Sequence, residues 1–103
     1  MENNVNELKR ALINSNWPKC IDLANELLSI GTPDAKEALI EGLKVKRHHV
    51  RTASIKALVG FNDKSVAVLL EEFLSDPAYE TRIEAKKGIK ALTGRDVKTS
   101  KGE

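Results

Sequence analysis

The sequence predicts an all-α solenoid built from three antiparallel helix pairs. The main observation is an internal repeat, because Leu8, Leu39 and Leu70 are spaced 31 residues apart and neighbouring apolar positions follow the same shift. Repeats of this length are typical of helical units that bury their apolar faces against one another. A second observation is that turn residues divide the chain into six segments with helical periodicity. None of them alternates with the period of two that strands require.

The six helices are delimited by turn signals that can be taken in order. Gly31, Gly60 and Gly94 each follow an apolar segment, where a left-handed residue typically closes a helix. Thr32 and Pro33 form a typical helix start, with a hydroxyl cap and a proline in the first turn. The first helix of each unit is expected over 2–14, 33–44 and 63–75, and the second over 17–30, 48–60 and 78–93.

The helices group into one domain over residues 1–94, followed by a tail. The units are expected at about 2–31, 32–61 and 62–94. With 103 residues, the chain has room for a single modest core. Residues 95–103 are largely charged or polar, and we expect them to form a disordered tail.

Composition restricts the class of partner. Hydrophobic residues make up 41% of the chain, and no apolar run reaches the roughly 20 residues that a membrane span needs, so no membrane partner is expected. The net charge of +2 is too small to indicate nucleic acid by itself. A single cysteine cannot form an internal disulfide, which favours a reducing, cytoplasmic location.

The second and third units carry a recognisable pattern. Its residues are Val50, Arg51, Ala57, Leu58 and Gly60 after one turn, and Asp76, Pro77, Arg82, Ala85, Ile89 and Leu92 after the next. This pattern resembles the HEAT repeat, in particular the short HEAT-like type named after phycobilisome lyases. The resemblance implies a right-handed stack of helix pairs that binds macromolecules along the inner surface formed by the second helices. It implies no enzymatic activity and no cofactor.

The resemblance also implies structural roles for three charged residues. In the family, an aspartate in the turn and an arginine six residues later stack between units, and Asp76 with Arg82 match that pair. Val45 stands where the second unit should have its aspartate, and Cys20 where the first unit should have its arginine. Arg51 therefore has no acid in its own turn, and it either pairs with Asp76 or remains free for an anion. We favour the pairing, because partly buried guanidinium groups are normally paired.

Candidate catalytic and metal-binding residues are few. Cys20 lies in the apolar stripe of its helix, which favours a core role over a nucleophile. His48 and His49 are adjacent, point about 100° apart on a helix, and have no third ligand at a suitable spacing, so no metal site is expected. Gly42 and Gly88 lie inside helices, where they are expected to allow close helix crossings.

The second helices carry the predicted binding surface. Nine positions related by the 31-residue shift should face away from the core: Ile21, Asn25, Leu28, Thr52, Lys56, Val59, Ile83, Lys87 and Lys90. Four are apolar and three are lysines, which favours an acidic or amphipathic segment of a protein partner. Nucleic-acid or other polyanion binding, self-association into a homo-oligomer and, less favoured, a role as an accessory subunit of a lyase-type enzyme remain as alternatives. The sequence names neither the partner nor the pathway.

Overall fold

The structure, a computed structural model, describes residues 4–100 and consists of helices without strands in that range. The α-helices are α1 (Asn4–Ile13), α2 (Lys19–Ile30), α3 (Pro33–Gly42), α4 (His48–Gly60), α5 (Val66–Leu70) and α6 (Tyr79–Thr93), and a 3-10 helix, η1 (Glu71–Ser75), follows α5. The predicted all-α solenoid is therefore confirmed. No helix in residues 4–100 is long and apolar enough to cross a membrane.

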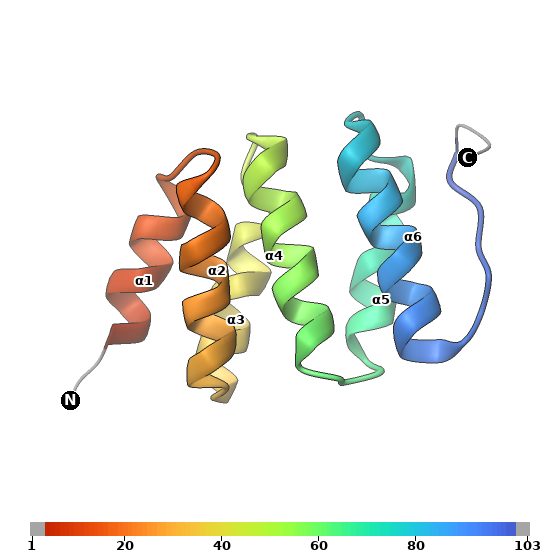
Figure 1. The fold of residues 1–103 in the computed structure, drawn as a ribbon. Coiled ribbons are helices and arrows are strands. Elements are labelled where there is room, and N and C mark those ends of the chain that lie inside the picture. The colour runs from red at the N-terminus through yellow and green to blue at the C-terminus, as the bar shows by residue number, and fades with distance from the viewer. Residues whose placement is uncertain (1–3, 101–103) are drawn as a thin grey trace.

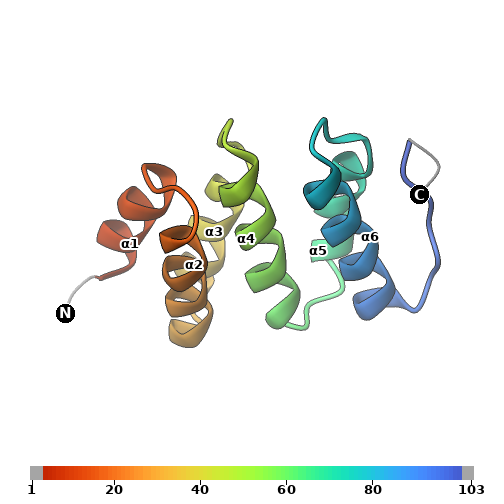
Figure 2. The same cartoon turned by 45° about the horizontal axis from the view of Figure 1, so that its top comes forward.

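The helices form two layers (Figures 1 and 2). Helices α2, α4 and α6 lie side by side in one layer, while α1, α3 and α5 lie behind them. All three helices of the first layer begin at the same edge of the molecule, because each is entered from a turn at that edge. The body measures 44 × 25 × 17 Å, so the α2–α4–α6 layer presents a long face.

The core runs continuously between the layers and follows the 31-residue shift. Leu27, Leu58 and Ile89 occupy corresponding positions in α2, α4 and α6, and all three side chains are fully buried. Leu39 and Leu70 are also fully buried in the other layer. Each fully buried side chain of this size stabilises the fold by about 1.5–3 kcal/mol, so stacking of the units supplies the main stabilisation.

Two of the three expected glycine caps are present. Gly31 and Gly94 adopt left-handed φ values of 71° and 78°, and their N–H groups donate to carbonyls of the preceding turn. Gly60 differs, because it is the last residue of α4 and the left-handed residue is Asn62, with φ 58°. Gly60 instead allows close packing, since a Cβ atom there would lie 2.6 Å from Leu28 Cδ2.

The first helix of the third unit is interrupted, whereas the sequence predicts one helix over 63–75. Helix α5 has five residues and continues as η1. Phe73 stands at the register position of Gly42, where the preceding unit brings two helices into close contact. A phenylalanine cannot fit such a contact. The 3-10 turn, with three residues per turn, places Phe73 below Leu70 on the buried face.

Residues 95–100 differ from the expected disordered tail. They run back along the last helix pair (Figure 1), where Val97 packs against the core and Thr99 is buried. The Ser100 N–H donates to the Leu74 carbonyl at 3.0 Å. The charged composition of this segment concealed its one apolar anchor. Residues 101–103 of the predicted tail lie outside the described residues.

Candidate functional site

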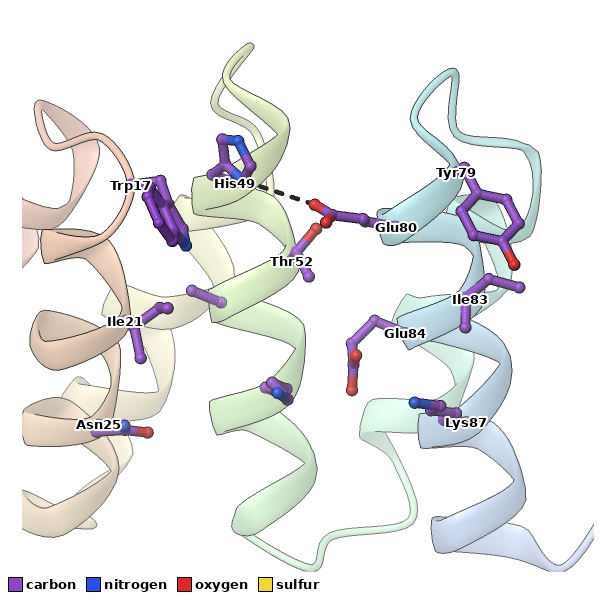
Figure 3. A pocket seen from close by; sticks show the side chains of 12 residues that line it. Trp17, Ile21, Asn25, His49, Thr52, Tyr79, Glu80, Ile83, Glu84 and Lys87 are labelled. Carbon is purple, nitrogen blue, oxygen red and sulfur yellow. Dashed lines mark ion pairs between the residues drawn. The ribbon is translucent and has the colours of Figure 1, made fainter.

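An open groove of about 560 Å³ crosses the face formed by α2, α4 and α6 (Figure 3). The structure places six of the nine predicted positions along it: Ile21, Asn25, Thr52, Lys56, Ile83 and Lys87. The remaining lining residues were not predicted: Trp17, His49, Ala53, Tyr79, Glu80 and Glu84. Each of the three helices contributes side chains, so the groove exists only when the units are stacked.

Three predicted positions do not line this groove. Leu28 packs against Gly60 of α4, and Val59 packs against Gly88 of α6, where an added Cβ would lie 2.7 Å from Val59 Cγ2. Lys90 Nζ turns toward the chain end and lies 3.3 Å from an Asp96 carboxylate oxygen. Leu28 and Val59 lie on helix flanks that the next helix covers, and a helical-wheel pattern for one helix cannot show that neighbour.

Two aromatic residues stand at one end of the groove. Trp17 and Tyr79 have exposed fractions of 60% and 59%, and both lie at the edge where the second helices begin (Figure 3). The 31-residue shift relates both residues to His48, and the side chains of Trp17 and Tyr79 are largely open to solvent. The 31-residue shift could have indicated these two groove residues, because it places an aromatic ring near the start of the second helix in each unit.

Charges in the groove are balanced between the two signs. Lys56 and Lys87 are accompanied by Glu80 and Glu84, so the formal charge of the lining is zero with histidine neutral. Glu80, Glu84 and Lys87 share one face of α6 at spacings of four and three residues. Glu80 precedes Ile83 by three residues and Glu84 follows it by one, whereas the prediction counted only the positions four and seven residues after Ile83.

The junction between units two and three contains a buried ion pair. Arg51 Nε and Nη2 donate to the two carboxylate oxygens of Asp76, each at 2.8 Å. Arg51 Nη1 also donates to the carbonyls of Val45 and Lys46. This is the pairing that the sequence favoured, and it joins the turn of one unit to that of the next.

Arg82 repeats part of this arrangement one unit later. Its Nη1 donates to the carbonyls of Asp76 and Pro77 at 2.9 and 3.1 Å, which correspond by the 31-residue shift to the carbonyls that Arg51 binds. Each arginine thus satisfies carbonyl groups of its own turn. The Asp76 side chain links the two units, because it accepts from Arg51 of the preceding unit. It also accepts from the Ala78 N–H in its own turn.

The first unit lacks this arginine, and another side chain replaces it. Arg47, from the turn of the second unit, donates to the carbonyls of Ser15 and Ile13. Cys20 occupies the register position of the arginine and is fully buried, with Sγ 3.5 Å from the His49 carbonyl oxygen. Burial raises the pKa of the Cys20 thiol, which keeps it protonated and suits a core role.

Helices α4 and α6 are further linked by threonines below the groove edge. Thr52 Oγ1 and Thr81 Oγ1 lie 2.9 Å apart, and Thr52 also donates to the His48 carbonyl at 2.8 Å. Thr81 is buried. These bonds hold the beginning of α4 against the beginning of α6.

Glu80 places a third group of the metal-ligand type beside His48 and His49, whereas the sequence shows no third ligand at a suitable spacing. Its Oε1 lies 3.5 Å from His48 Nε2. The same oxygen lies 3.6 Å from His49 Nδ1, the contact drawn as a dashed line in Figure 3. The imidazole rings are close, with centroids 4.1 Å apart and planes inclined by 37°. The sequence missed this cluster because Glu80 is supplied by the next unit rather than by local spacing.

The HEAT repeats family matches residues 6–90, a range that begins within α1 and ends within α6. No curated protein matches the chain. The match agrees with the layered helices and with the arginine–aspartate contacts at the turns. The chain therefore belongs to the HEAT-repeat family.

Proposed function

We propose that this protein is a non-catalytic scaffold that binds an amphipathic segment of a protein partner in the groove across α2, α4 and α6. Helical-repeat solenoids typically use extended surfaces of this kind to bind other macromolecules. The fully buried thiol of Cys20 is inaccessible to a substrate, which supports a binding role over a catalytic one.

The observation that carries the proposal is the combination of exposed apolar groups in one groove. Trp17 and Tyr79 are more than half exposed, and Ile21 is 42% exposed. Aromatic residues with apolar neighbours dominate the energy of protein interfaces, because they desolvate a large area at a low cost in conformational entropy. An apolar face on the partner would cover these side chains.

The charges favour a partner segment that carries both signs. Lys56 and Lys87 would bind acidic side chains of the segment, whereas Glu80 and Glu84 would attract basic ones. A nucleic-acid backbone suits the groove less well, because the two glutamates repel phosphate and Lys90 already pairs with Asp96. We therefore infer protein recognition and treat polyanion binding as an outcome to be tested.

The test compares variants of the full chain in an affinity purification. Ile21→Asp places a charge at the apolar part of the groove, and Val68→Asp makes the same change at a 69% exposed position of α5 outside the groove. Proteins captured by the wild type and by Val68→Asp, but lost with Ile21→Asp, would support the proposal. Capture that is unaffected by Ile21→Asp would contradict it.

Two further measurements distinguish the alternatives. Light scattering would detect a second copy of the chain in the groove as an oligomer that Ile21→Asp dissociates. Titration with mixed-sequence DNA and RNA at two salt concentrations would detect polyanion binding, which should weaken steeply with salt and on Lys56→Ala. Either result would overturn the proposal of a protein partner.

A further inference from the structure

We propose that His48, His49 and Glu80 form a binding site for one divalent transition-metal ion of the zinc class. The three ligand atoms come from the beginnings of α4 and α6. His49 and Glu80 also line the groove (Figure 3). One ligand atom from each residue can be chosen so that all three lie within 4.8 Å of one another. This site goes beyond the proposed scaffold role and does not depend on it.

The distances fit tetrahedral coordination after small movements. Zinc bonds to histidine nitrogen and carboxylate oxygen are about 2.0–2.2 Å long, so neighbouring ligands of a tetrahedral ion lie about 3.3 Å apart. The two distances from Glu80 Oε1, 3.5 and 3.6 Å, are already close to this value. The side chains are 36–60% exposed, so rotation of the histidine rings can close the remaining separation.

The backbone supports this geometry. Adjacent residues of a helix normally point about 100° apart, but His48 and His49 are the first two residues of α4, and their ring centroids lie 4.1 Å apart. The His48 carbonyl accepts from Thr52, which contacts Thr81 of α6. These bonds fix the spacing of the two helix ends that carry the ligands.

The donor set identifies the class of ion. Two imidazole nitrogens and one carboxylate oxygen suit zinc and its neighbours, whereas magnesium and calcium prefer oxygen ligands alone. Three protein ligands leave a fourth position for water or for a group of another molecule. A bound ion would connect α4 with α6 and thereby join units two and three at the edge of the groove.

The chain contains a convenient reporter for this site. Trp17 is the only tryptophan, and its ring centroid lies 6.0 Å from that of His49. A paramagnetic ion such as Ni²⁺ bound to His49 should quench its fluorescence. Calorimetry with Zn²⁺ would give the stoichiometry independently. Both measurements require protein without a histidine tag.

The variants separate the proposed ligands from their surroundings. Glu80→Gln and His49→Ala should each weaken zinc binding at least about tenfold, because loss of a ligand costs no less than loss of an outer contact. Glu84→Gln, one turn further along α6, and Cys20→Ala should change it less than about twofold. Far-ultraviolet circular dichroism checks that each variant is folded.

The expected result is one zinc ion per chain, quenching of Trp17 by Ni²⁺, and no response to Mg²⁺. Zinc binding that is lost in Glu80→Gln and retained in Glu84→Gln would support the site. The proposal would be overturned if the wild type binds no zinc at millimolar concentration, or if Glu80→Gln binds it as well as the wild type does.

Discussion

At the scale of single residues, buried polar groups decide how the units join. The side chains of Arg51 and Asp76 are only 11% and 5% exposed. Both charges are satisfied, since Asp76 accepts from Arg51 and from the Ala78 N–H, while Arg51 also donates to two carbonyls. Removing one partner would leave an uncompensated buried charge, which costs more than the pair itself contributes.

Asp76→Asn should therefore lower the free energy of unfolding by about 3–5 kcal/mol, because the Arg51 guanidinium loses its counter-charge in a buried place. Urea denaturation measures the change. The matched control is Glu41→Gln, which breaks the exposed pair with Lys44 and should cost less than about 1 kcal/mol. A loss below about 1 kcal/mol for Asp76→Asn would show that the pair is dispensable.

Ser54 and Gly42 form a second buried contact. Ser54 is fully buried, and its Oγ is a side-chain atom without a hydrogen-bond partner among the described residues. A Cβ on Gly42 would lie 2.2 Å from that oxygen. Ser54→Ala should thus raise the free energy of unfolding by about 1 kcal/mol, because it removes an unsatisfied polar group.

Gly42→Ala should lower the free energy of unfolding by about 1–3 kcal/mol through overpacking. The loss should be smaller in the Ser54→Ala background, because the nearest clashing atom is then absent. Thermal melts of the four proteins of this double-mutant cycle give the coupling energy. Strictly additive effects would mean that the two positions are not in contact.

At the scale of elements, α3 packs closely against α1 and α4 but makes few contacts with the short helix α5. The change from α5 to the narrower 3-10 helix η1 interrupts the α-helical surface of this layer. A surface contact spans the two elements, because Lys36 of α3 pairs with Asp63 in the turn before α5. Asp63 also accepts from the Ser65 N–H and hydroxyl.

These contacts predict a dependence of stability on pH. Hydrogen bonds from Lys36 and from Ser65 lower the pKa of Asp63 from its ordinary value of 3.8 to about 2. A carboxylate whose pKa is lower in the folded state stabilises the fold above its ordinary pKa, and this contribution disappears as the pH falls to the lowered value. The melting temperatures of wild type and Asp63→Asn should therefore converge between about pH 4 and pH 2.

Lys36→Met tests the cause of that shift. It removes the largest interaction that lowers the Asp63 pKa, so its melting temperature should also approach that of the wild type over the same pH range. A difference between wild type and Asp63→Asn that stays constant down to pH 2 would show that the Asp63 carboxylate has no lowered pKa.

At the scale of the whole molecule, the solenoid is elongated and each unit contacts its neighbours, which in general permits units to unfold separately. Here the turn of the first unit is capped by Arg47 of the second, and the third unit supplies Asp76 to Arg51. These contacts connect all three units.

We therefore expect one cooperative unfolding transition. Trp17 fluorescence reports on the first turn, whereas far-ultraviolet circular dichroism reports on all helices, and the two urea curves should coincide. Arg47→Met should move the Trp17 transition to lower urea than the dichroism transition, because the carbonyls of Ser15 and Ile13 lose their donor. Separate transitions in the wild type would contradict this cooperative behaviour.

The family and the helical architecture could be predicted because each unit carries apolar residues at the same positions. Leu39 and Leu58, which are fully buried, are examples. Six groove positions followed from the same periodicity. Glu80 and Arg47 could not be predicted, because their contacts cross between units and no local spacing signals them. The likeness to the phycobilisome-lyase type of repeat and the right-handed sense of the stack remain predictions from the sequence.

The contacts of Arg47 and Arg51 bear on how such an array can lengthen or shorten during evolution. Deleting the 31 residues of the middle unit would keep the leucine register, so the apolar faces of the first and third units could still pack against each other. Asp76 would nevertheless face Cys20 where it now meets Arg51, and the Ser15 carbonyl would lose Arg47. Each unit thus carries side chains that suit only its own position in the stack. A change in the number of units therefore requires compensating changes in these side chains.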